Sequence, residues 1–190
     1  NSDNLDHIES ELIKLTPNTT PAIRKSHIAL LECLRISRYI AQGEIEKAKT
    51  SYLLIQKNDL EKFLTKGSIA YYVFLASKHN IALLLSDYES SINALSEYLE
   101  IIPKEHNDYL FYKSMLACSY SFCGDFTEAN RLTQEIVSEW KMKNDQGDIE
   151  YRMKRDDSLI KLIATLLNTH ISHNGDTTPE IRYNLREILS

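Results

Sequence analysis

The chain has 190 residues, of which 43% are hydrophobic and 26% are charged, a composition typical of a single soluble folded domain. Its net charge of −5 argues against a nucleic-acid-binding surface on this segment. No apolar run approaches the roughly 20 residues that cross a bilayer, so we expect neither a nucleic-acid partner nor membrane insertion. The 5 glycines and 4 prolines stand at apparent helix ends, which favours an all-α fold over a β fold with many turns.

Apolar residues at helical spacing predict a first helix at residues 3–15, within an N-terminal segment of residues 1–18. Thr20 can cap the second helix, Pro21 suits its first position because proline lacks an N–H there, and Gly43 ends it. A third helix is predicted for residues 44–64. The second and third helices would form a first hairpin, residues 20–64.

Four further helices are predicted in two more hairpins. After the Lys66-Gly67 turn, Ser68 can cap a helix that runs to about residue 85, and a helix from residue 87 to residue 102 ends before Pro103. Asn107 can cap a helix that runs to residue 123, and another helix covers residues 126–143. The predicted hairpins therefore occupy residues 68–103 and 107–143.

The C-terminal part of the chain predicts helices at residues 149–171 and 178–189, which form a degenerate unit or a cap over residues 149–190. The sequence TTPAIR at residues 19–24 nearly repeats as TTPEIR at residues 177–182, an offset of 158 positions. This offset fits four repeats of about 40 residues. We therefore expect about nine helices in one domain of residues 1–190, with short connections that make neighbouring helices antiparallel.

One turn pattern recurs within this series. A helix ends at a turn residue, an acidic residue opens the next helix, and a small residue follows five positions after the turn. In each copy, three positions can be compared: the residue four before the turn, the turn residue, and the small residue five after it. In order along the chain, these are Tyr39, Gly43 and Ala48; then Ala82, Ser86 and Ser91; then Tyr120, Gly124 and Ala129. The second copy has lost both the tyrosine and the glycine.

These residues resemble the tetratricopeptide repeat, and the third hairpin resembles it best. Leu116, Ala117 and Tyr120 match the pattern of the first helix, Gly124 matches the turn, and Ala129 matches the small residue of the second helix. The resemblance covers three hairpins, one good and two partial. It implies a right-handed α-solenoid of antiparallel helical hairpins, and the related α-solenoids stay open as alternatives.

In the family that the chain resembles, the first helix of each hairpin lines a concave, peptide-binding groove. Alignment by the turns predicts the groove positions Leu30, Cys33, Ser37 and Ile40; Val73, Ala76, Asn80 and Leu83; and Phe111, Ser114, Cys118 and Ser121. These positions lack a Lys/Arg cluster, so the carboxylate-binding role of one family subgroup is not expected. The groove could accept a partner's helix or strand. It could equally be filled by the chain itself, for example by the opening helix.

Other candidate sites have simpler explanations. Three cysteines in no framework spacing predict free thiols in a reducing compartment. His170 and His173 stand three apart, but solvated histidines at a helix end explain them better than a metal site does. The run of mixed charges at residues 151–157 fits a solvated helix face, and several tyrosines could form an interaction surface or separate helices: Tyr71, Tyr72, Tyr98, Tyr109 and Tyr112. No catalytic motif is recognised, so we expect no enzyme activity, cofactor or metal.

The leading hypothesis is a non-catalytic scaffold that binds a protein or peptide, with a homo-oligomer possible. Its context would be the interaction or sensor module of a larger bacterial regulatory protein. The alternatives are a free-standing chaperone of a secretion system and a small-ligand sensor. Because the sequence does not begin with Met, we expect either a cleaved mature form or a domain excised from a longer chain, and we favour the excised domain. A cytoplasmic location is expected, or a periplasmic one if the domain belongs to a membrane sensor.

Overall fold

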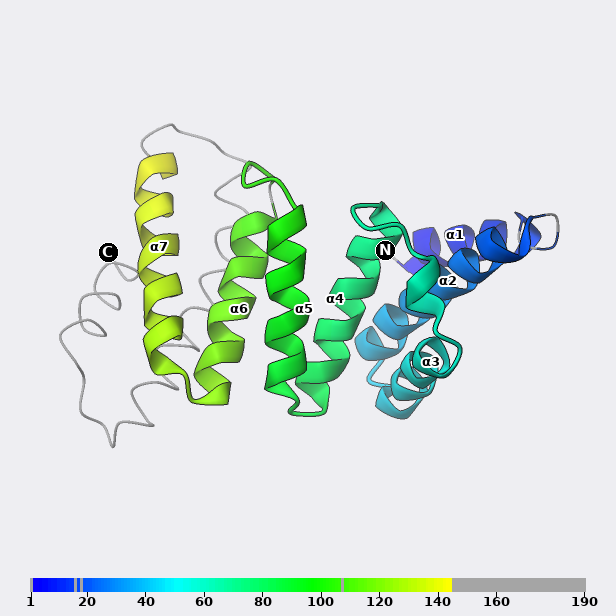
Figure 1. Ribbon diagram of the computed structural model, residues 1–190, viewed down its shortest axis with the longest axis horizontal. Coiled ribbons are helices and arrows are strands. Elements are labelled where there is room, and N and C mark those ends of the chain that lie inside the picture. Colours follow the sequence, from blue (N-terminus) through cyan, green and yellow to red (C-terminus); the bar gives the residue numbers. More distant parts are fainter. Residues whose placement is uncertain (1, 16, 18, 107, 145–190) are drawn as a thin grey trace. The chain divides into compact units, whose positions relative to one another are not determined.

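A computed structural model of the chain describes residues 2–15, 17, 19–106 and 108–144 (Figure 1). Over these residues the regular structure is helical, with seven α-helices, one 3₁₀ helix and no strand. The elements are α1 (Ser2–Leu15), α2 (Pro21–Ala41), α3 (Ile45–Lys57), η2 (Leu60–Phe63), α4 (Ile69–Leu84), α5 (Tyr88–Ile101), α6 (Tyr109–Cys123) and α7 (Phe126–Asn144). The helices predicted at residues 149–171 and 178–189 lie outside the described residues.

The chain separates into two compact units, residues 1–87 and 88–190. In the first unit, α2 is the central helix, because α1, α3, η2 and α4 all pack against it. In the second unit, α5, α6 and α7 stand side by side in chain order, with α6 in the middle (Figure 1). The predicted division into one domain with successive repeat units stays a prediction.

Three helices end in the same hydrogen-bonded turn. In each, an N–H reaches back five residues to a carbonyl: Glu44 to Tyr39 (2.8 Å), Asp87 to Ala82 (2.9 Å) and Asp125 to Tyr120 (3.0 Å). The turn residue itself donates to the carbonyl three residues before it, as Gly43, Ser86 and Gly124 do at 3.0 to 3.2 Å. This pair of bonds is a Schellman motif, which satisfies carbonyls that a helix end leaves unpaired.

The turn residue of a Schellman motif adopts a left-handed conformation, and all three turn residues do so. The φ angles are 74° at Gly43, 90° at Gly124 and 57° at Ser86. Glycine reaches this region without steric cost, whereas serine does not. The second copy of the turn has therefore kept its backbone geometry although its glycine is gone.

Small residues five positions after each turn are fully buried. Ala48, Ser91 and Ala129 are each 0% exposed. In the second unit the Ser91 hydroxyl lies 2.8 Å from the Ser119 hydroxyl of α6, so α5 and α6 approach closely at this point. The residues that carry the repeat pattern thus pack helices against one another.

Two helix starts, those of α2 and α4, follow the capping chemistry that the sequence predicts, and α7 has a further cap that was not predicted. The predicted cap Asn107 lies outside the described residues. The Thr20 hydroxyl accepts the Ile23 N–H at 3.4 Å, and Pro21 is the first residue of α2. The Ser68 hydroxyl accepts the Tyr71 N–H at 3.3 Å, and the Asp125 carboxylate accepts the Glu128 N–H at 3.1 Å. Each bond satisfies an N–H that has no partner within its helix.

The predicted helix over residues 44–64 is wrong in its second half. α3 ends at Lys57, and the separate 3₁₀ helix η2 follows after Asp59, whose φ is 49°. The Asn58 amide donates to the Leu54 carbonyl at 2.8 Å and so competes with continuation of the helix. The break lets Leu60 and Leu64 enter the core of the first unit, where both are buried.

Candidate functional site

The predicted groove positions of the first unit lie on α2 and α4 and differ in burial. Ser37, Val73, Ala76 and Asn80 are half-buried, so part of each is open to contact. Cys33 is fully buried, and its carbonyl accepts the hydroxyls of Ser37 at 3.2 Å and Ser77 at 3.3 Å. The bond from Ser77 joins α4 to α2. At Cys33, the chain therefore uses a predicted groove position for packing between helices.

Burial also sets the chemistry of the Cys33 thiol. Loss of solvation disfavours the thiolate and raises the pKa of this group to about 12. A thiol is reactive when it is exposed and its pKa is lowered, so Cys33 lacks both conditions. Cys118 is half-buried and Cys123 is exposed.

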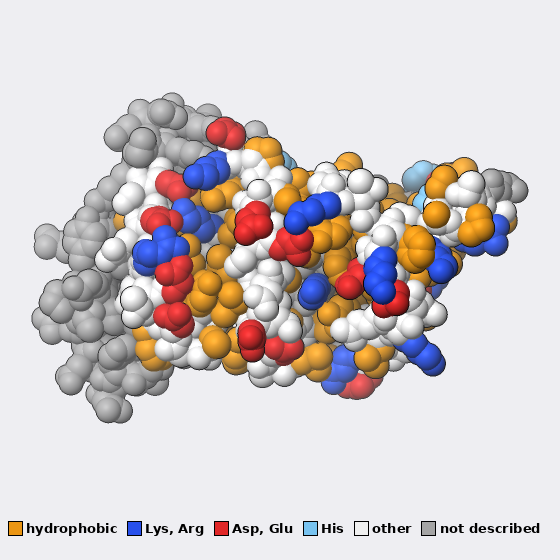
Figure 2. Space-filling view, viewed as in Figure 1, with side chains coloured by type: hydrophobic (Ala, Val, Ile, Leu, Met, Phe, Trp, Pro, Cys, Tyr) orange, Lys and Arg blue, Asp and Glu red, His pale blue; other side chains and the backbone are white. Residues whose placement is uncertain are grey.

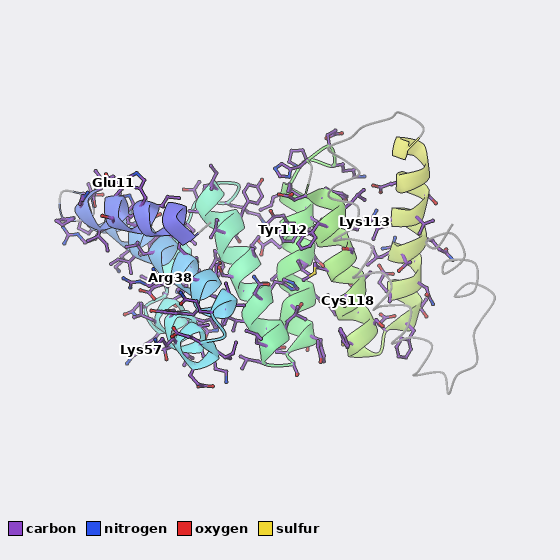
Figure 3. The ribbon with its side chains drawn as sticks, turned by 180° about the vertical axis from the view of Figure 1, so that it is seen from behind. Glu11, Arg38, Lys57, Tyr112, Lys113 and Cys118 are labelled. Carbon is purple, nitrogen blue, oxygen red and sulfur yellow. The ribbon has the colours of Figure 1, made fainter. Side chains whose placement is uncertain are left out.

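The groove positions of the second unit lie on α6 and show the same mixture. Phe111 and Cys118 are half-buried, and Figure 3 labels Cys118 near the lower end of α6. Ser114 and Ser121 are buried, and the Ser114 hydroxyl donates to the Phe111 carbonyl at 2.6 Å. These two serines are therefore not surface groups.

Comparison by distance from the turn separates contact positions from packing positions. Six residues before the turn, Ser37, Asn80 and Cys118 are all half-buried, and seven residues before it, Ile36, His79 and Ala117 are all buried. Thirteen residues before the turn, Leu30, Val73 and Phe111 are again half-buried. At two of the predicted groove positions, six and thirteen residues before the turn, the side chains are therefore half-buried in α2, in α4 and in α6 alike.

A buried lysine that pairs with two partly exposed carboxylates in the second unit was not foreseen from the sequence. The Lys113 ammonium of α6 lies 2.8 Å from a Glu139 carboxylate oxygen and 3.1 Å from one of Glu135, both on α7. Figure 3 labels Lys113 on the side of α6 that faces α7. Burial alone would lower the pKa of Lys113, but the hydrogen bonds to Glu139 and Glu135 outweigh it and raise the pKa.

Sequence reasoning missed this interaction because the position of Lys113, eleven residues before the turn, has no constant character: it is Leu75 in α4 and Glu32 in α2. The signal available was spacing: Glu135 and Glu139 stand four apart and so share one face of a helix. Lys113 thus links α6 to α7 through both Glu135 and Glu139, and we interpret the interaction as a structural contact.

The tyrosines proposed as a surface are largely packing residues. Tyr98 and Tyr109 are buried, and the rings of Tyr98 in α5 and Tyr112 in α6 have centroids 4.0 Å apart (Figure 3). Burial raises the pKa of the Tyr112 hydroxyl. Tyr71 and Tyr72 are half-buried. In the second unit, therefore, tyrosine rings pack between neighbouring helices, as Tyr98 and Tyr112 do between α5 and α6.

The first unit contains a pocket that sequence reasoning did not predict. It has a volume of about 290 Å³ and is lined by Ile13 of α1, by Pro17, and by Arg24 and Leu31 of α2. The Arg24 guanidinium donates to the carbonyls of Pro17 at 3.1 Å and Thr19 at 3.5 Å. Among the described residues that line it, Arg24 is the cation and the others are apolar. We call this feature the hairpin pocket.

Four large aliphatic side chains of the same helices are exposed. Figure 2 shows hydrophobic side chains over α1 and the start of α2. Ile8, Ile13, Leu15 and Ile23 are between 44 and 57% exposed. Ile8 and Leu15 belong to the apolar residues at helical spacing in α1, and their exposure shows that α2 covers this stripe of α1 only in part.

Metal and membrane features can be assessed for the described part of the chain. Within it, no three His, Cys, Asp or Glu side chains are grouped in a way that could hold a metal ion. Of the helices traced there, none combines the length and apolar character that crossing a bilayer requires. His170 and His173 lie outside the described residues.

No protein-family model matches the sequence, and no curated protein shows significant similarity to it. Two solved structures resemble the fold. A protein described as a kinesin light chain of Podosopora anserina, with nearly identical TPR-like repeats, is 17% identical, with 99% of this chain and 86% of that chain covered and a TM-score of 0.60. A substituted form under the same description is 14% identical, with 99% and 84% covered and a TM-score of 0.61.

The chain has a divergent TPR-like helical-repeat fold. At 14 and 17% identity, these likenesses establish the fold and leave the function open. The likeness to TPR-like structures agrees with the three Schellman turns and with the buried small residue that follows each of them in this chain. The handedness of the repeat and the count of nine helices stay predictions.

Proposed function

We propose that the chain is a non-catalytic scaffold that binds a protein or peptide through the first helices of its hairpins. The proposed contact residues are the two rows of half-buried groove positions together with Ala76. The rows are Leu30, Val73 and Phe111, and Ser37, Asn80 and Cys118. The observation that carries the proposal is the equal exposure of equivalent positions on α2, α4 and α6. Packing accounts for Cys33, Ser114 and Ser121, so these three are not included.

The small size and weak polarity of these residues favour a partner that lays an extended or helical segment along them. Ala76 and Ser37 allow close approach of a backbone, whereas Val73 and Phe111 offer apolar contact. The strongest ionisable interactions in the described residues have structural explanations, as Lys113 and the Arg131–Glu128 pair illustrate. We propose no catalytic role.

Site-specific photo-crosslinking in a lysate of the source cells tests this proposal. A photoreactive amino acid is placed at Asn80 on α4 or at Phe111 on α6. The matched control position is Leu54 on α3, which is exposed but belongs to the second helix of a hairpin. We expect a protein partner to crosslink from Asn80, from Phe111 or from both, and not from Leu54. Crosslinking from Leu54 alone, or from all three positions equally, would contradict the proposal.

We further propose, from the family resemblance, that the scaffold serves as the interaction or sensor module of a larger bacterial regulatory protein. The domain arrangement of the encoding gene tests this. An adjoining DNA-binding, kinase or cyclase domain is expected. A free-standing gene of this length beside secretion genes would favour the secretion-chaperone alternative instead.

A further inference from the structure

The α1–α2 hairpin combines two features that are complementary to each other. Its pocket of about 290 Å³ is apolar, with the Arg24 guanidinium as its charged group. Its first helix, α1, has four acidic residues and one lysine, together with the exposed aliphatic side chains Ile8 and Leu15. The pocket therefore suits an acidic, aliphatic helix, and α1 is such a helix.

We propose that two copies of this chain associate through their α1–α2 hairpins. In this dimer, each copy lays α1 against the hairpin pocket of the other. Ile8 and Leu15 of one copy would cover the pocket, and the acidic charge of that α1 would lie near Arg24 of the second copy. Residues on one patch then meet the same patch on the other copy, as a two-fold interface requires.

The electrostatics favour this occupant over an arbitrary apolar partner. Glu11 on α1 is exposed and pairs with Lys14 at 2.8 Å, which lowers the pKa of its carboxyl; the other three acidic residues of α1 leave the helix with net negative charge. Arg24 uses one guanidinium nitrogen for the Pro17 and Thr19 carbonyls, and the planar group has further N–H donors. In the proposed dimer, the negative charge of α1 from one copy would lie near the positive charge of Arg24 in the hairpin pocket of the other copy.

This surface differs from the proposed groove on α2, α4 and α6. The two proposals can therefore fail separately. The groove proposal concerns a different protein, and the hairpin proposal concerns a second copy of the chain. The small area of one hairpin implies a weak dimer with a dissociation constant on the order of micromolar.

Sedimentation equilibrium of the full 190-residue chain tests the proposal. We expect the average mass to rise from one chain mass of 21.9 kDa toward twice that value between about 1 and 200 μM. The double variant Ile8→Ser/Leu15→Ser should weaken association at least about tenfold, because it removes two apolar contacts from each half of the interface. Arg24→Glu should weaken it as well.

The control is Leu53→Ser, which removes an equally large side chain that is 61% exposed on α3 of the same unit. It should dimerise like the unmodified chain. Circular dichroism of each variant checks that helix content is kept, since Arg24 also holds the Pro17 and Thr19 carbonyls. A chain that stays at 21.9 kDa over this range would overturn the proposal, as would equal weakening by Leu53→Ser.

Discussion

At the scale of single residues, the turn positions show how a repeat pattern decays without losing its geometry. Gly124 and Gly43 adopt positive φ angles that glycine tolerates, and Ser86 adopts the same conformation with a side chain present. A Cβ at Gly124 would meet no heavy atom within 4 Å. Any cost of a substitution there is therefore a cost of backbone conformation and not of collision.

The turns can be tested by opposite substitutions. Gly124→Ala should lower the free energy of unfolding by about 1 kcal/mol, because the left-handed conformation is strained for an L-residue. Ser86→Gly should raise it by about 0.5 kcal/mol, since the relief of strain exceeds the added freedom of the unfolded chain. Urea denaturation measures both. Destabilisation by Ser86→Gly would show that the serine side chain contributes a contact that outweighs its strain.

The thiols should differ in reactivity in the order of their burial. Exposed Cys123 should react with a thiol reagent within minutes at pH 8, and buried Cys33 only as fast as the protein unfolds. The Cys123→Ser variant is the control that removes the fast phase. The pKa of Cys33 is raised from 9.0 to about 12, so the neutral thiol is retained in the folded chain at any pH used for labelling. Fast labelling of Cys33 in the native state would contradict its placement.

At the scale of elements, packing between neighbouring helices depends on few contacts of known chemistry. In the second unit, Ser91 and Ser119 join α5 to α6, and Lys113 joins α6 to α7. The first is a close approach that small residues permit. The second is a buried cation whose two carboxylate partners are partly solvated, so it combines attraction with only part of the usual desolvation cost.

Removal of the Lys113 charge should be costly. Lys113→Met keeps the apolar stem but removes both ion pairs, and we expect the free energy of unfolding to fall by about 1–3 kcal/mol at pH 8. The control Lys62→Met breaks a pair with Asp59 in which both side chains are 65% exposed, and it should change stability little. Thermal unfolding followed by circular dichroism measures both variants. Equal effects of the two substitutions would contradict the structural role of Lys113.

The same pair predicts a pH dependence. Because the folded-state pKa of Lys113 is raised, its contribution is fully present below the unfolded-state pKa of about 10.4 and is lost as the pH rises through the folded-state pKa. The stability difference between the unmodified chain and Lys113→Met should therefore be constant from about pH 8 to about pH 9.5 and shrink above about pH 10.5. A difference that stays constant through about pH 12 would contradict the ion pair.

Elements were predictable from the sequence where local chemistry decides them. Thr20, Ser68 and Asp125 cap α2, α4 and α7 through their own side chains, and Gly43 and Gly124 end α2 and α6. The bounds of these helices therefore agree with the pattern closely. The break after Lys57 was missed although Asn58-Asp59 is a weak turn signal. Both residue types compete with the helix backbone, and Asp tolerates the left-handed conformation that Asp59 adopts. Burial of Cys33, Ser114 and Ser121 also depends on neighbouring helices, and a pattern along one helix cannot contain that information.

At the scale of the whole molecule, the described residues form two compact helical units that share one turn geometry. The likeness to TPR-like structures spans 99% of the chain at 14 to 17% identity, so geometry has persisted where sequence has not. The residues that carry the repeat pattern are those that pack helices. The half-buried positions of the first helices are the ones that this packing leaves open to a partner.

Hydrogen exchange with and without the crosslinked partner is the decisive experiment for the binding surface. If the first helices form this surface, the backbone amides of α2, α4 and α6 should gain protection on binding, whereas those of α3 should not. Gains confined to α3, or no gain on α2, α4 and α6 with the partner bound, would show that the first helices do not bind the partner.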